Sequence, residues 1–218
     1  MLAVVRVGVV SSGSWCLDFV ASFWEGGAWV VMLMLREHDS IVSQAACQQA
    51  IVAADGVPLL LGVLATSSNL ARQYSLEALA ACVVSEIIRN AVVKADGVKA
   101  ITAALSAAVA GSQEQRHAVV ILNGIVTTAE SAAAVLEFNG TPALAECLKL
   151  PVATAKDAVE SAVALLTRIC EVGGADKKGK IAVAGAGTIA PLVALLSLPV
   201  MSKSAVHCLR FESHGAML

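Results

Sequence analysis

The sequence has few charged residues and few aromatic rings. Of its 218 residues, 15% are charged and 4% are aromatic, whereas 57% are hydrophobic. A formal net charge of −2 supplies no basic surface, so neither nucleic acid nor an anionic membrane is an expected partner. Most of the apolar residues are Ala, Val and Leu. Such small and medium side chains favour close packing between helices over a sandwich of sheets.

The sequence also lacks the cysteine spacing of a metal site. Its six cysteines stand at positions 16, 47, 82, 147, 170 and 208, without a C-x-x-C pair. The only adjacent His and Cys are His207 and Cys208, so no metal and no cofactor is expected. We expect buried structural thiols in a reducing compartment, which favours a cytoplasmic protein, with the nucleus also possible.

Residues 1–40 differ in composition from the rest of the chain. Five of the eight aromatic residues lie here: Trp15, Phe19, Phe23, Trp24 and Trp29. Asp18, Glu25 and Arg36 interrupt every window long enough to cross a membrane, so a membrane partner is not expected. We interpret this part as an atypical hydrophobic end segment that packs on the next element, or as the edge of a fragment.

Beyond residue 40 the sequence repeats itself. Four stretches align: VAADGVPLLLGVL (52–64), VKADGVKAITAAL (93–105), LEFNGTPALAECL (136–148) and VAGAGTIAPLVALL (183–196). The residues that follow the turn in each stretch are Val57, Val98, Thr141 and Ile189, at steps of 41, 43 and 48 residues. Periods near 40–47 residues are typical of solenoids with two or three helices per repeat.

Each repeat has the same predicted order of elements. A short helix leads to a turn containing Asp-Gly, Asn-Gly or Ala-Gly, whose residues tolerate a positive φ. A second helix follows, and a polar linker leads to a longer third helix, predicted over 69–87, 112–129 and 154–172. In the first third helix, Leu70, Leu76, Leu79 and Val83 follow helical spacing. In the last repeat, Ile189 and Leu192 are expected in the core.

These residues resemble the armadillo repeat, whose second helix opens with a pattern close to AGAIPPLVxLL. AGTIAPLVALL (186–196) matches it closely and ADGVPLLLGVL (54–64) matches it well. The resemblance covers about residues 41–210 and implies an all-α fold, a right-handed α-α superhelix of about four three-helix repeats. The predicted divisions are the end segment 1–40, repeats at 41–85, 86–128 and 129–172, and a partial repeat with a tail at 173–218.

Two nucleotide-like motifs lie in the last repeat. Gly185-x-Gly187-x-x-Ala190 resembles a dinucleotide-binding turn, and the stretch from Gly174 to Lys180 matches a phosphate loop up to its last position. Ile181 stands where that loop needs a hydroxyl, and no other repeat carries G-x-G. A nucleotide-binding enzyme acting through 174–190 is therefore the third and least favoured hypothesis.

The resemblance also implies a binding groove lined by the third helices. In nuclear import adaptors of the family, a Trp and an Asn four residues later repeat along that groove. Here the Trp positions hold Glu77, Val120 and Ala164, and the Asn positions hold Ala81, Gly124 and Arg168. Asn123 is one residue away from the pattern. The sequence therefore does not predict an import receptor.

A mixed-charge stripe occupies that helix face instead. The candidate partner-binding residues are Gln73, Glu77, Arg116, His117, Glu160 and Arg168. They predict a groove for a protein or peptide partner of neither strong charge. An ordinary solvated helix face is the alternative interpretation.

The predicted function is a non-catalytic protein–protein interaction module that binds a partner chain on the concave face of stacked third helices. No nucleophile and base are placed together by the sequence, so no catalytic residue is predicted. The first alternative is a structural scaffold, a fragment of a longer multi-repeat protein. It implies exposed apolar ends and end-to-end self-association.

Overall fold

The computed structural model describes residues 51–53, 55–65, 69–172, 178–197 and 205–209, together with the backbone of two short strands. The strands are β1 (Gly8–Val9) and β2 (Trp15–Cys16), which pair antiparallel. Apart from these strands, the predicted hydrophobic end segment lies outside the described residues, as does Cys47.

The rest of the described chain is helical and repeats in units of three helices. The first helices are α6 (Glu86–Lys94), α9 (Ala129–Glu137) and α12 (Lys178–Gly185). The second helices are α4 (Gly56–Leu64), α7 (Gly97–Ala107), α10 (Gly140–Leu148) and α13 (Ile189–Leu195). The third helices are α5 (Asn69–Cys82), α8 (Gln113–Ile125) and α11 (Val152–Val172). Residues 205–209 are also helical.

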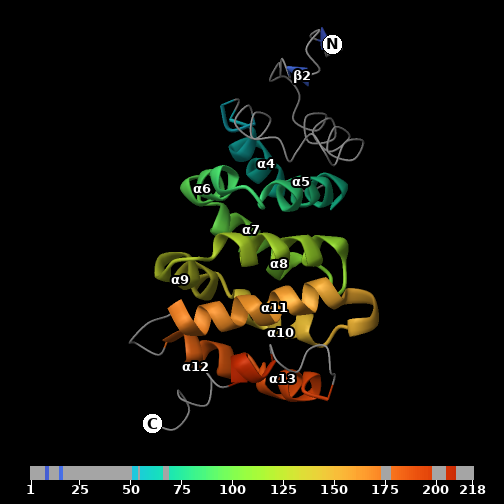
Figure 1. Ribbon diagram of the computed structural model, residues 1–218, viewed down its shortest axis with the longest axis vertical. Helices are drawn as coiled ribbons and strands as arrows, with labels where there is room; N and C mark the ends of the chain where they lie inside the picture. Colours follow the sequence, from blue (N-terminus) through green and yellow to red (C-terminus); the bar gives the residue numbers. More distant parts are fainter. Residues whose placement is uncertain are drawn as a thin grey trace.

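Helices of one kind stack along the long axis of the molecule. Figure 1 shows α5, α8 and α11 one after another down this axis, with α6, α9 and α12 along one edge. The predicted all-α solenoid is therefore confirmed. The divisions of the chain at residues 85, 128 and 172 remain predictions. Among the described residues, no single helix is long and apolar enough to span a membrane. Helices α12 and α13 reach that length and apolar composition only when taken together, and they are bent by 79° relative to each other.

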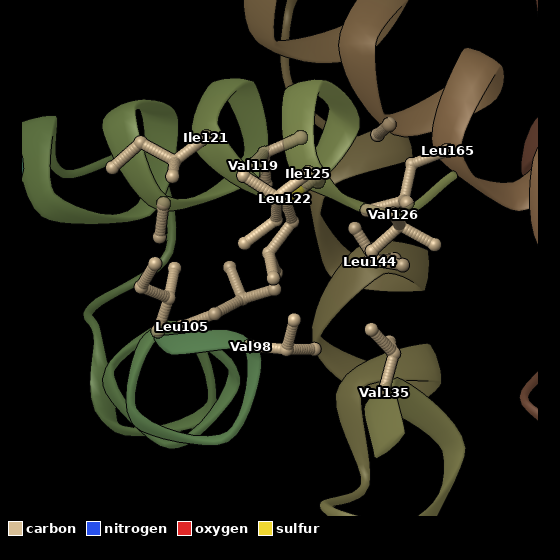
Figure 2. Packing of buried hydrophobic residues seen from close by; sticks show 14 of the residues in the cluster. Val98, Leu105, Val119, Ile121, Leu122, Ile125, Val126, Val135, Leu144 and Leu165 are labelled. Atoms are coloured by element: carbon tan, nitrogen blue, oxygen red, sulfur yellow. The ribbon is translucent and has the colours of Figure 1, made fainter. Parts of the chain in front are cut away.

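One hydrophobic core runs through the stack. Val119, Leu122 and Ile125 of α8 lie in it with Val98 and Leu105 of α7 (Figure 2). Side chains from α9, α10 and α11 join the same cluster, so α8 is enclosed by its own repeat and by the next one. Burial of aliphatic area at about 25 cal/mol per Å² is the main favourable term in such a core.

In the first three repeats, two residues of the turn before the second helix have different roles: one takes a left-handed backbone conformation, and the glycine after it allows close packing. Asp55, Asp96 and Asn139 adopt left-handed backbone conformations with φ of 52°, 54° and 55°. The glycine after each of them allows close packing: a Cβ at Gly97 would lie 2.4 Å from Cγ1 of Val92, and one at Gly140 would lie 2.6 Å from Cγ1 of Val135. The expectation of a positive φ at this turn is met by Asp and Asn, which tolerate that region best after Gly.

In the fourth repeat, the equivalent turn is formed by different residues. Gly187 takes the left-handed conformation, with φ of 77°, and the buried Thr188 stands where the other repeats have glycine. The Thr188 hydroxyl donates a hydrogen bond of 2.9 Å to the carbonyl of Val183. The preceding segment, α12, is a helix, whereas a dinucleotide-binding turn needs a strand there.

Several details of the predicted helices are corrected by the structure. The third helix expected over 69–87 ends at Cys82, because Ser85 is extended and begins a new helix at Glu86. The Arg89 guanidinium donates to the carbonyls of Val83 and Val84, at 3.2 and 2.8 Å, and so satisfies acceptors at that break.

Two residues expected to be apolar core are exposed. Leu192 is buried as predicted, but Ile189 is exposed because no described helix covers this side of α13. Leu70 is also exposed, in the first turn of α5.

The close packing at Gly97 can be tested by substitution. Gly97→Ala should lower the free energy of unfolding by about 1–3 kcal/mol, because the new methyl group collides with Val92. Gly62→Ala is the matched control: nothing lies within 4 Å of its Cβ position in α4, so a gain of roughly 0.5–1 kcal/mol is expected. Urea unfolding measures both. Equal effects of the two substitutions would contradict the proposed packing.

Candidate functional site

Partly exposed residues recur along each of the third helices. On α8 these residues recur at helical spacing, as Arg116, His117, Val120 and Asn123. With the partly exposed residues of the neighbouring helices they make what we call the third-helix face: Gln73, Glu77, Arg116, His117, Val120, Asn123, Glu160 and Arg168. All six residues predicted to bind a partner lie on it. Their role in binding remains a prediction.

Polar contacts join neighbouring third helices across this face. Arg72 Nε of α5 lies 3.8 Å from Glu114 Oε1 of α8, and both side chains are largely buried. Arg168 of α11 donates through Nη1 to the main-chain carbonyl of Asn123 in α8. These contacts bridge successive repeats, so the spacing of the third helices is fixed by polar bonds as well as by the core.

Glu160 is held differently. Its Oε1 lies 3.8 Å from Lys156 Nζ, one turn away on the same helix, and both side chains are about half exposed. An exposed pair of this kind contributes little to stability. Glu160 therefore remains available to a partner at small cost.

His117 and Glu77 interact through their charges. Burial, the largest cause, lowers the pKa of His117 below 6.5; the Glu77 carboxylate raises it and the neighbouring Arg116 lowers it. The imidazole is therefore neutral at pH 7. A neutral imidazole offers one hydrogen-bond donor and one acceptor.

Three polar atoms of α8 are buried without a hydrogen-bond partner. They are Nε of Arg116, Nδ1 of His117 and Oδ1 of Asn123. Leaving such an atom unsatisfied costs about 1–3 kcal/mol, so native structures rarely do so. The side chains that carry these atoms are partly exposed on the third-helix face, although the three atoms themselves are enclosed.

Two parts of this arrangement were not predicted from the sequence. Asn123 falls one position from the expected ladder and was therefore not predicted as a site residue, and the Arg72–Glu114 pair was not predicted at all. The spacing of Asn123 from Arg116 and Val120 does place it on the same helix face, which is a signal that could have been used. The Arg72–Glu114 pair depends on how two helices stack and has no local signal.

The described cysteines do not resemble nucleophiles. Cys82, Cys147, Cys170 and Cys208 are buried, as expected. Burial raises the pKa of Cys82 to about 11 and that of Cys147 to about 12. Since the thiolate is the reactive form, both thiols are inert near neutral pH. In the same part of the chain, no group of three or more His, Cys, Asp or Glu residues could hold a metal ion.

A shallow apolar cleft lies on the side of the second helices. It has a volume of about 280 Å³ between α4 and α7, lined by Leu61 and Leu64 on one side and by four alanines on the other. Arg72 is the one charged residue in its lining, and it is engaged by Asn69 and Glu114. The cleft arises because α7 carries Ala where α10 carries Glu146 and Cys147.

The lowered pKa of His117 gives a pH-dependent stability. Above pH 6.5 the imidazole is neutral in both the folded and the unfolded chain, so it imposes no penalty. As the pH falls below 6.5, the unfolded chain takes up a proton that the folded chain resists, and the free energy of unfolding falls. His117→Gln should therefore lose less stability than the wild type between pH 7.5 and 5.5. Thermal melts measure this, and parallel pH profiles would contradict it.

Comparison with known proteins identifies the fold. No protein-family model and no curated protein matches the sequence. Among solved structures, a designed armadillo repeat protein in complex with the peptide (KR)4 has a TM-score of 0.65 and 16% identity, covering 89% of this chain and 88% of its own. A computationally designed armadillo repeat protein for modular peptide recognition has a TM-score of 0.65 and 17% identity, covering 89% and 81%.

A natural system is similar as well. A chain from a structure on the phosphorylation switch between cadherin and β-catenin has a TM-score of 0.69 and 13% identity, covering 91% of this chain and 39% of its own. The repeat length, the three-helix units, the stacked third helices and these likenesses agree. The chain therefore has an armadillo-like repeat fold.

Proposed function

We propose that this protein is a non-catalytic interaction module that binds an extended segment of a partner protein on the third-helix face. The observation that carries the proposal is the row of partly exposed polar side chains on the stacked third helices, among them Arg116, His117 and Asn123, each of which has one polar atom without a hydrogen-bond partner. An extended peptide carries free N–H and C=O groups along its length, which can pair with these side chains once they turn toward it.

The dimensions of the face suit a short peptide. Adjacent packed helices lie roughly 8–10 Å apart, so α5 to α11 spans about 18 Å. An extended chain rises about 3.3 Å per residue, so about six residues would cross the three helices. The stacking of α5, α8 and α11 in Figure 1 makes this path continuous.

The charges suggest the chemistry of the peptide. The face presents a neutral His117 that interacts with the charges of both Glu77 and Arg116. Glu160 and Arg168 follow on α11. Carboxylates and guanidinium groups alternate, so a peptide of mixed charge fits better than a strongly basic or strongly acidic one. The face is built before binding, which reduces the entropy lost when the partner docks.

Similar structures support a protein or peptide as the partner, because two of them concern peptide recognition. We further propose a cytoplasmic or nuclear location, supported by the buried thiols of Cys82 and Cys147.

A peptide selection followed by substitution tests the proposal. Random hexapeptides would be selected on the immobilised full chain, and the affinities of selected peptides measured by calorimetry. Asn123→Ala should weaken binding by about tenfold, because a hydrogen bond of roughly 1.4 kcal/mol is lost. Arg116→Ala should weaken it by at least as much.

Asn90→Ala is the matched control, since Asn90 is an exposed residue of the first helix α6. It should leave the affinity unchanged. If Asn123→Ala and Arg116→Ala bind the selected peptides as tightly as the wild type, the third-helix face is not the binding site.

A further inference from the structure

The last repeat exposes two large apolar side chains on one side of α13. Ile189 is 44% exposed and Val193 is 51% exposed, and they lie one turn apart. Leu196, one turn further, is half-buried. Together these three residues form what we call the C-terminal end face.

The corresponding positions of the earlier repeats are buried. The left-handed residues Asp55, Asp96, Asn139 and Gly187 align the four turns, and the sixth residue after each can then be compared. These sixth residues are Leu61, Thr102 and Ala145, exposed by 7%, 0% and 2%, against 51% for Val193. The residues two positions after each left-handed residue show the same difference: Val57, Val98 and Thr141 are buried, whereas Ile189 is exposed. The end face therefore corresponds to a surface that is buried in each of the earlier repeats.

The described repeats show what covers it. A Cβ at Gly97 would lie 3.2 Å from Cδ1 of Leu61, and one at Gly140 would lie 2.9 Å from Cγ2 of Thr102. α4 and α7 thus each pack one side chain against the residue that opens the next second helix. We call this contact the repeat joint. Val193 occupies the position that Leu61 and Thr102 have in the earlier repeats, but no described residue lies opposite it to complete the joint.

The other half of a repeat joint lies on the first described repeat. Among described residues, the atoms nearest to a Cβ at Gly56 all belong to Ile51, in its own repeat. Leu59 of α4 is 47% exposed, although its counterpart Ala100 lines the cleft against the preceding second helix. The first and last described second helices, α4 and α13, therefore carry the two complementary halves of one contact.

We propose that a second copy of this chain docks head to tail on the C-terminal end face, with its Gly56 and Leu59 opposite Val193 and Ile189. The joint would continue the packing already present between α4 and α7 and between α7 and α10. It is a heterologous contact, so it adds copies in a row without closing into a symmetric dimer. It is independent of the third-helix face, which stays open to a partner.

Analytical ultracentrifugation of the full chain over a wide concentration range tests this docking. The average mass of the wild type should rise with concentration. Val193→Asp should shift this rise to at least tenfold higher concentration, because a carboxylate would be buried in the joint. The matched control is Ile181→Asp. Ile181 is 62% exposed on α12, at a position that is also exposed in the earlier repeats as Asn90 and Ala133. It should associate like the wild type.

Mixing two variants tests the head-to-tail direction. Leu59→Glu damages the other half of the joint and should also suppress association when alone. A mixture of Leu59→Glu and Val193→Asp retains one good half on each chain, so it should form one-to-one dimers and nothing larger. Association of Leu59→Glu alone to a dimer would contradict the direction, because it would indicate pairing between two C-terminal ends. A wild type that stays monomeric at every concentration would overturn the proposal and leave the end face to a different helical partner.

Discussion

The repeat joint is the contact on which the rest of this structure depends. Leu61 can approach Gly97, and Thr102 can approach Gly140, only because the residues that open α7 and α10 have no side chain. Asp96 and Asn139 take the strained turn conformation just before it and leave the glycine free for packing. The joint sets how closely the repeats stack. It therefore sets the spacing of α5, α8 and α11, and with it the shape of the third-helix face.

Much of this architecture could be predicted from the sequence, because a repeated turn leaves a repeated signature. The Asp-Gly and Asn-Gly pairs and the apolar spacing after them predicted the second helices and the solenoid. The local sequence pattern did not show that Asp96 takes the left-handed conformation and that Gly97 provides space for packing, since both residues tolerate a positive φ. Only the neighbouring Val92 and Leu61 show that the glycine is needed for space. The exposure of Ile189 was missed for a related reason: burial at that position depends on the next repeat and not on α13 itself.

The candidate site was predicted less completely. Helical spacing selected residues of α5, α8 and α11 that are partly exposed in the structure, because partial exposure repeats every three to four residues. It could not reveal that Arg168 would engage the carbonyl of Asn123, or that the Asn123 side-chain oxygen would stay unpartnered. Such details depend on how two helices stack, which distant parts of the chain decide together. The same stacking gives the protein two separate surfaces, a polar one along the third helices and an apolar one on α13.

A double-mutant cycle across one joint tests the central claim most directly. Thr102→Ser removes the methyl group that lies nearest to the Cβ position of Gly140 from the neighbouring repeat, and it keeps the hydroxyl that donates to Val98 at 2.7 Å. Gly140→Ala should cost about 1–3 kcal/mol in the wild type and measurably less when residue 102 is Ser, by more than about 0.5 kcal/mol. If the two effects add within about 0.3 kcal/mol, the side chain at 102 and the residue at 140 do not meet, and the account of the repeat joint is wrong.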